Sequence, residues 1–273
     1  MPELPEVETF VRSLKFGGMT GEPVLDRKIS SAALLWQRTL ASSDAGDEFL
    51  SWFQEKTIRD VTRRGKYIIL QIPPKYLLIH LRMSGDIKVD DGGSLTEKHT
   101  RFLMKFEDGT RMQFIDTRKF GRIWLTDDPE SVVHKLGIEP LGEVFTSDWL
   151  TAKIAHSPRM IKPFLLDQSI IAGLGNIYTD ESLFMAGIHP KRKAQSLSAG
   201  EAEKLVNTIR QVLAEGIRLN GASIDWVYRG GQFQNHFMVY QRAGQKCPHC
   251  GALIQKTTVG QRGTHFCPVC QPE

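Results

Sequence analysis

The sequence has no cysteine before position 247 and no run of eighteen consecutive apolar residues. The first absence excludes a disulfide framework for the whole fold, and the second excludes an apolar transmembrane helix. The amino terminus lacks the basic residues and apolar core of a secretory signal, since Glu3, Glu6 and Glu8 stand there instead. We therefore expect a cytoplasmic protein without a membrane partner. Its 273 residues, 41% of them hydrophobic, suffice for two domains.

Basic residues are locally clustered, although the net charge is only +4. Between Lys56 and Tyr67 there are five basic residues and one acidic residue, and between Thr151 and Lys193 there are six and three. Such clusters suit contacts with phosphates. An ordinary solvated surface explains the same clusters, so both interpretations stay open at this point.

Hydrophobic periodicity changes along the chain. Val7, Phe10, Val11 and Leu14 repeat at helical spacing and predict an amphipathic helix over 5–16. β-branched and aromatic runs then predict strands over 67–72, 76–81, 101–106, 111–115 and 121–125, with a tight hairpin at Asp108-Gly109. Residues 1 to about 135 are therefore expected to form an antiparallel sandwich or barrel.

The second half is helical in pattern. A stretch rich in Gly, Pro and Ser over 137–147 marks the domain boundary. Helices are predicted over 151–156, 162–168, 178–186 and 200–219, followed by a short metal-type hairpin over 246–271.

The four cysteines form two CxxC pairs separated by sixteen residues: Cys247, Cys250, Cys267 and Cys270. Each pair can supply two thiolates to one tetrahedral Zn²⁺, and four thiolates leave no open position for catalysis. We therefore predict one structural zinc ion, with His249 or His265 as less favoured replacement ligands. A zinc-ribbon module of a transcription or replication factor would explain this hairpin but not the other nine-tenths of the chain.

Pro2 becomes a secondary terminal amine if Met1 is removed, which small penultimate residues generally permit. A terminal amine has a pKa of about 7.8, against about 10.4 for lysine, so more of it is neutral and nucleophilic at pH 7. Glu3 and Glu6 stand beside it. Acids at a helix start are also ordinary complements of the helix dipole, so the terminus alone does not establish a function.

Four separated motifs resemble bacterial formamidopyrimidine-DNA glycosylases: the opening MPELPEVET, Arg63-Arg64-Gly65-Lys66, the Gly173-Leu-Gly-Asn176-Ile-Tyr segment and Gln261-Arg262-Gly263-Thr264. The resemblance runs from end to end. It implies an α+β fold with an N-terminal antiparallel β-sandwich, a leading α-helix, a C-terminal helical domain with a helix–two-turn–helix element, and a four-cysteine zinc-finger β-hairpin. The expected boundaries are 1–135 for the catalytic domain, 136–150 for a linker, 151–235 for the helical domain and 236–273 for the hairpin.

The resemblance implies a base-excision repair enzyme that removes oxidised purines, such as 8-oxoguanine and formamidopyrimidines, and cleaves the abasic site by β,δ-elimination. Pro2 matches the nucleophile that forms an iminium intermediate, and Glu3 the acid/base residue. Glu6 matches a carboxylate near the sugar or lesion. Lys66 and Arg262 match positions with proton-transfer or phosphate-positioning roles.

DNA contacts are also implied by the resemblance, because a base inside a duplex must be flipped out and its place filled. The void-filling positions are Met83, Arg118 and Phe120, and a further contact is His99. In the helix–two-turn–helix segment, over 164–188, Asn176 matches a phosphate contact, joined by Lys162 and Arg159. Without the resemblance, Met83 and Phe120 would be read as core residues.

One segment departs from the family pattern. The loop between Ala222 and Phe233 is several residues shorter than the lesion-capping loop. A related enzyme that prefers hydantoins or oxidised pyrimidines therefore stays open, as does a non-catalytic lesion-binding protein. In each case the expected partner is double-stranded DNA with oxidised bases or abasic sites, bound by a monomer that associates with the nucleoid.

Overall fold

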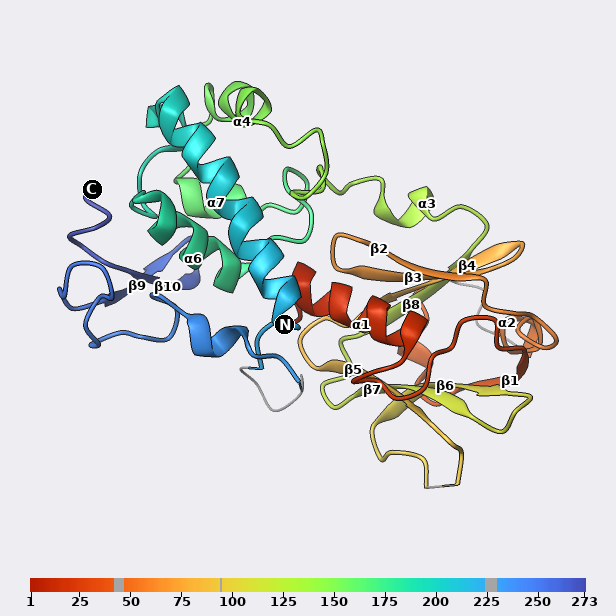
Figure 1. The fold of residues 1–273 in the computed structure, drawn as a ribbon. Coiled ribbons are helices and arrows are strands. Elements are labelled where there is room, and N and C mark those ends of the chain that lie inside the picture. Colours follow the sequence, from red (N-terminus) through yellow and green to blue (C-terminus); the bar gives the residue numbers. More distant parts are fainter. Residues whose placement is uncertain (42–46, 94, 224–229) are drawn as a thin grey trace. The chain divides into compact units, whose positions relative to one another are not determined.

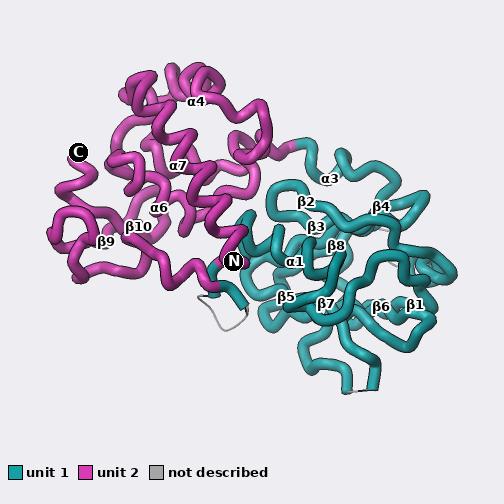
Figure 2. Tube along the Cα trace, viewed as in Figure 1, with its two compact units in different colours: residues 1–134, 222–231 teal, residues 135–221, 232–273 magenta. Residues whose placement is uncertain are grey.

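The computed structural model describes residues 1–273 apart from 42–46, 94 and 224–229. The chain forms two compact units, made of residues 1–134 with 222–231 and residues 135–221 with 232–273 (Figure 2). The second unit is thus interrupted in sequence by a segment that belongs to the first. The predicted four-part division of the chain stays a prediction.

The first unit contains two antiparallel four-stranded sheets (Figure 1). One has the strand order β1-β6-β7-β5, with β1 at Ile29–Leu34, β5 at Gly85–Asp90, β6 at Thr100–Phe106 and β7 at Arg111–Asp116. The other has the order β2-β3-β4-β8, with β2 at Asp60–Arg64, β3 at Tyr67–Ile72, β4 at Lys75–His80 and β8 at Arg122–Thr126. β6 and β7 form the predicted hairpin across Asp108-Gly109.

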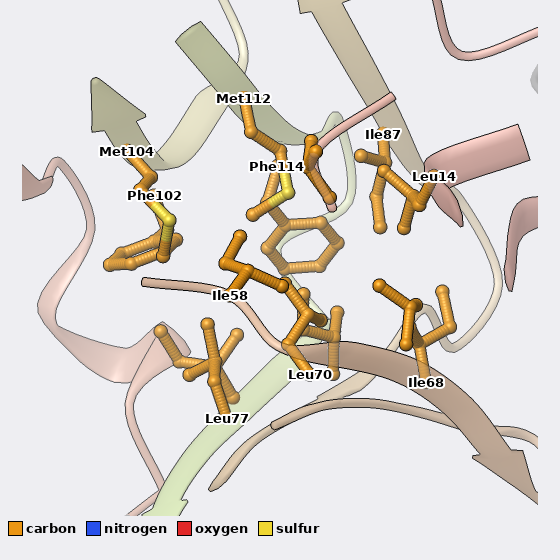
Figure 3. Close-up of a cluster of buried hydrophobic side chains, with 14 of the residues drawn as sticks. Leu14, Ile58, Ile68, Leu70, Leu77, Ile87, Phe102, Met104, Met112 and Phe114 are labelled. Carbon is orange, nitrogen blue, oxygen red and sulfur yellow. The ribbon is translucent and has the colours of Figure 1, made fainter. Parts of the chain in front are cut away.

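Both sheets bury one face in a common core (Figure 3). Alternate residues of a strand point to opposite faces, so Ile68 and Leu70 of β3 enter the core together. Phe102 of β6 and Phe114 of β7 come from the other sheet. This packing confirms the predicted antiparallel sandwich with a leading helix.

Helix α1 covers Leu4–Phe16 and packs against β2 and β3. Val7, Phe10 and Leu14 lie on one face at helical spacing, and all are buried in the same core. Pro5 occupies the first turn, where its missing N–H costs no hydrogen bond. Shorter helices of this unit are η1 at Gln37–Thr39, α2 at Asp47–Ser51 and α3 at Glu130–Val133.

The second unit is mainly helical, as predicted. Its α-helices are α4 at Ser147–Ile154, α5 at Ile161–Leu165, α6 at Asn176–Ala186 and α7 at Ala199–Arg218, with 3-10 turns η2 at Ala194–Ser196 and η3 at Phe233–His236. Helix α7 begins at a capping box, in which Ser198 N donates to Glu201 Oε2 at 2.8 Å and Glu201 N donates to Ser198 Oγ at 3.3 Å. Across the described residues, no helix is long and apolar enough to span a membrane.

The connection from α5 to α6 is fixed by the Gln168 side chain. Its amide nitrogen donates to the carbonyls of Leu166 and Leu174, and its amide oxygen accepts from Gly173 N at 2.9 Å. These bonds give three backbone groups of the connection a hydrogen-bond partner. The connection therefore fixes the position of Asn176 at the start of α6.

The carboxyl-terminal hairpin consists of β9 at Gln255–Val259 and β10 at Arg262–Phe266. β10 contacts α6, and residues that flank the hairpin form a small apolar cluster with Phe184 of α6: Val239, Cys247, Ile254 and Cys267. Glu181 of α6 also holds the segment before the hairpin, since its carboxylate accepts hydrogen bonds from the backbone N–H groups of residues 238–240. Burial nevertheless raises the pKa of Glu181 above its ordinary value.

Candidate active site and DNA-contact residues

Two buried carboxylates stand at the amino-terminal end of α1. Glu3 precedes the helix and its backbone N–H donates to Glu6 Oε2 at 2.8 Å. The other oxygen, Glu6 Oε1, accepts from Ala222 N at 2.7 Å. Pro2 is buried next to them in sequence. Glu6 is therefore held in place from two parts of the first unit that are far apart in the chain.

Lys66 is buried in the turn between β2 and β3, the two strands on which α1 packs. Its neighbour Tyr67 stacks edge-on with His80, with 4.7 Å between ring centroids. Burial, together with the positive charges of Arg82 and Lys66, lowers the pKa of His80 to about 3. His80 is accordingly neutral at physiological pH, and its Nδ1 accepts from Arg82 N at 3.0 Å.

Met83 and Phe120 are exposed, with 45% and 47% of their surfaces accessible. The reading of these two as core residues, which their strand context alone favours, is therefore wrong. Arg118 is exposed as well, and its guanidinium carbon lies 5.0 Å from the centroid of the Phe120 ring. An exposed apolar side chain beside an arginine is suited to insertion between bases. His99 is half-buried, with Nδ1 3.3 Å from Arg101 Nη2.

Lys162 lies in the interior of the second unit, whereas a side chain that binds a phosphate of DNA lies at the surface. It is completely buried, and its Nζ is 2.6 Å from Asp180 Oδ1, 2.8 Å from Thr264 Oγ1 and 3.0 Å from the Gly263 carbonyl. An ammonium group has three protons, and these three acceptors match them. The predicted phosphate contact of Lys162 is not supported by this position; in the structure it ties α5 to α6 and the hairpin.

The other predicted contacts of the second unit are more accessible. Asn176 donates through Nδ2 to the Gly263 carbonyl at 3.0 Å, while its Oδ1 has no hydrogen-bond partner. Arg159 is exposed and paired with Asp167 at 2.9 Å. Arg262 is exposed at the start of β10. Asn176 and Lys162 thus bond to the same backbone carbonyl, one residue after Arg262.

The four cysteine sulfurs lie within 4.8 Å of one another. Cys247 Sγ is 3.8 Å from Cys270 Sγ, and Cys250 Sγ is 3.5 Å from Cys267 Sγ. Zinc–sulfur bonds of about 2.3 Å in tetrahedral geometry place sulfurs about 3.8 Å apart, so the site fits one Zn²⁺. Within the described residues this group holds no histidine: His249 packs on Phe184, and His265 Nδ1 is 3.5 Å from Asp180.

Sequence reasoning missed two buried acids that hold these groups, Asp116 and Asp180. Asp180 lies in a polar stretch of α6, between Thr179 and Glu181, and Asp116 ends β7 directly before the Arg118 loop. The junction of an apolar strand with a basic loop is the signal that marks Asp116, whereas Asp180 carries no comparable local signal. The short loop predicted after Ser223 lies largely outside the described residues.

Comparisons with known proteins agree across the whole chain. Three family models match: the formamidopyrimidine-DNA glycosylase N-terminal domain at residues 1–123, its H2TH domain at 136–227, and the zinc finger found in FPG and IleRS at 244–272. A formamidopyrimidine-DNA glycosylase of Halalkalibacterium halodurans is 40% identical over 279 residues, which cover 99% of this chain and 100% of the relative.

Solved structures of a Lactococcus lactis Fpg have the same fold. Its complexes with DNA containing an N7-benzyl-Fapy-dG and with DNA containing an abasic site both give a TM-score of 0.91 at 38% identity. They cover 100% and 99% of this chain and 100% of the Lactococcus chain. The class is therefore that of the zinc-finger DNA glycosylases. Within that class, the chain belongs to the formamidopyrimidine-DNA glycosylase family, and its hairpin is a structural zinc finger.

Proposed function

We propose that this protein is a bifunctional base-excision enzyme that removes oxidised purines from double-stranded DNA and then cleaves the strand at the abasic site. The observation that carries the proposal is the buried pair Glu3 and Glu6 at the start of α1, directly after Pro2. Full-length similarity to named glycosylases, and to a relative bound to lesion-containing and abasic DNA, supports the same function. Action on chromosomal DNA would bring the protein to the nucleoid.

The proposed nucleophile is the secondary amine of Pro2 after removal of Met1. Its nitrogen lone pair forms a bond to C1′ of the damaged nucleotide, while the bond from C1′ to the base breaks and the base leaves with that electron pair and a proton. The amine then loses its proton, and the C1′–O4′ bond opens to give the iminium. Glu3 is the proposed group that accepts and returns these protons.

The iminium makes the subsequent strand cleavage possible. Loss of a proton from C2′ expels the 3′ phosphate, and loss of a proton from C4′ expels the 5′ phosphate, so both eliminations are redox-neutral. We propose that Lys66 and Arg262 assist by moving protons or by holding the leaving phosphates. Glu6 accepts a hydrogen bond from Ala222 N, and we propose that its carboxylate lies near the sugar or the lesion.

Borohydride trapping tests the nucleophile. The iminium accepts hydride to give a stable amine link, so processed protein is expected to form a covalent complex with duplexes that contain 8-oxoguanine or an abasic site. The matched variant retains Met1, or carries an acetylated terminus, and is checked for zinc content and thermal stability. Undiminished trapping by the blocked variant would contradict the Pro2 mechanism.

A substrate panel separates the enzyme from a lesion-binding protein. Duplexes with 8-oxoguanine, formamidopyrimidine, a hydantoin, an oxidised pyrimidine and an abasic site are compared for binding and for strand cleavage. Cleavage strongest on the two oxidised purines supports the proposal. Tight binding without turnover on any substrate would establish the non-catalytic alternative instead.

A further inference from the structure

Asp116, the last residue of β7, is a buried carboxylate to which all the predicted DNA contacts of the first unit are connected. Those contacts come from three separate segments, which carry Met83, His99 and the pair Arg118 and Phe120. None of these four side chains is itself buried. The connections run through hydrogen bonds of the Asp116 side chain and backbone.

The loop that carries Arg118 and Phe120 is bonded to both carboxylate oxygens. Arg118 N donates to Asp116 Oδ1 at 3.1 Å, and Gly121 N donates to Asp116 Oδ2 at 2.7 Å. A Cβ on Gly121 would lie 2.3 Å from the Phe114 ring, so the loop closes tightly over the carboxylate. Lys119 at the tip has a φ of +61°, a conformation that a lysine keeps only under constraint.

The loop that carries Met83 is bonded to the same carboxylate. Ser84 Oγ donates to Asp116 Oδ1, and Arg118 N lies 3.3 Å from that same hydroxyl. Gly85 pairs with Asp116 across β5 and β7. Position 85 has no room for a side chain either, because a Cβ there would lie 2.5 Å from the Leu81 carbonyl oxygen. Ser84 therefore joins the two wedge loops through one buried acceptor.

The backbone of Asp116 extends the connection to His99. Asp116 N donates to the His99 carbonyl at 2.9 Å. The Asp116 carbonyl accepts from Arg101 Nε at 2.7 Å, and the same guanidinium places Nη2 3.3 Å from His99 Nδ1. One residue thus receives or donates hydrogen bonds toward every segment that presents a predicted DNA contact in this unit.

We propose that Asp116, with Ser84, is the positioning residue that holds the two wedge loops in register for opening the DNA duplex. The proposal rests on the proposed function and deepens it. A wedge enters a base stack only if its exposed side chains stay extended instead of collapsing onto their own surface. Fixed hydrogen bonds to a buried carboxylate prevent that collapse, because breaking them leaves buried donors unsatisfied.

Asp116→Asn and Ser84→Ala test this role by comparing two substrates. Strand cleavage is measured on an abasic site in a duplex and on the same site in a single strand, which needs no wedge. Asp116→Asn places an amide N–H group against backbone N–H donors that the carboxylate accepts in the wild type. We therefore expect kcat/KM on the duplex to fall about 10-fold to 100-fold. The rate of single-strand cleavage should change by less than about 3-fold. Ser84→Ala should also lower kcat/KM on the duplex, but by a smaller factor.

Asp90→Asn is the matched control. Asp90 is also a carboxylate of this sheet with strong internal partners, Arg111 Nε at 2.5 Å and Gln113 Nε2 at 2.6 Å. It stands at the opposite end of β5 from Gly85, away from the wedge loops. The control should lose thermal stability as Asp116→Asn does, yet keep the duplex to single-strand ratio of the wild type.

An unchanged duplex to single-strand ratio in Asp116→Asn would overturn the proposal; if both substrates lost activity equally, Asp116 would have a general structural role. Fluorescence of 2-aminopurine opposite the abasic site gives a second measurement, since wedge insertion unstacks that base. It should rise on binding of the wild type and of Asp90→Asn, and rise less with Asp116→Asn. If the proposed function itself is wrong, the wild type will cleave neither substrate, and this outcome is distinct from those that overturn the role of Asp116.

Discussion

Lys162 and Asp180 form a fully buried ion pair, with 2.6 Å between Nζ and Oδ1 and both side chains completely inaccessible. The second carboxylate oxygen, Asp180 Oδ2, accepts from the backbone N–H of His265 at 2.9 Å. Helix α6 is thereby bonded both to α5 and to the middle of β10. The pair joins the helix–two-turn–helix element to the zinc finger within one unit.

Breaking this pair from one side is expected to destabilise the second unit strongly. Lys162→Met leaves the Asp180 charge buried without its cation, which costs about 3–5 kcal/mol in comparable pairs. The double variant Lys162→Met/Asp180→Leu removes both charges and should recover a large part of that loss. Urea unfolding of the wild type, both single variants and the double variant measures the coupling, and additive losses would contradict it.

Salt dependence distinguishes buried from exposed cations. Each phosphate contact contributes about 0.9 to the slope of log K against log salt on duplex DNA. Arg262→Ala is expected to reduce the slope by about one contact, because Arg262 is exposed. Binding by Lys162→Met, compared over the same salt range, should keep the wild-type slope. If the slope of log K against log salt falls in Lys162→Met and not in Arg262→Ala, Lys162 is a phosphate ligand.

Removal of zinc should unfold the finger selectively. Its apolar cluster is small, and the sulfur site supplies the remaining constraint on the hairpin. After chelation, amide hydrogen exchange is expected to accelerate over 255–266 while strands β3 and β4 of the first unit keep their protection. One zinc per chain should be released. Retained protection of the hairpin in the chelated protein would show that the metal is dispensable for its fold.

Acid sensitivity is predicted at the start of α7. Hydrogen bonds from Arg192 hold the pKa of Glu201 at about 2, against an ordinary value of 4.5. A depressed pKa in the folded state stabilises the protein above pH 4.5, and this contribution disappears as the pH falls from about 4.5 to about 2. Glu201→Gln should therefore be less stable at neutral pH and lose less stability on acidification. Parallel pH profiles for the two proteins would contradict this assignment.

The sequence predicted those elements whose signals are local. Helix α7 begins within one residue of its predicted start, since Ser198 and Glu201 form a capping box that depends on neighbours only. The sulfur site is equally local in its CxxC spacing. By contrast, β1 has four small residues between Ile29 and Leu34, and β5 has only Ile87 and Val89 among charged residues, so their β-strand signals are weak and both were missed.

Side-chain exposure was harder to predict than secondary structure. Met83 and Phe120 are apolar, and only the resemblance to the family marked them as surface residues. Lys162 shows the opposite error, because a lysine in a basic segment is expected in solvent, whereas Asp180 and Thr264 hold it inside. These partners lie 18 and 102 residues away in the chain. No local pattern contains that information.

The hydrogen bond from Ala222 to Glu6 has a consequence for how such proteins can be recombined. Residues 222–231 are encoded between two stretches of the second unit, yet they belong to the first. A chimera that exchanges everything after residue 134 would replace this segment too. The Glu6 carboxylate would then face a segment from a different protein. Inheritance of the first unit as a self-sufficient module is thus constrained by residues 222–231, which are encoded within the stretch that makes the second unit.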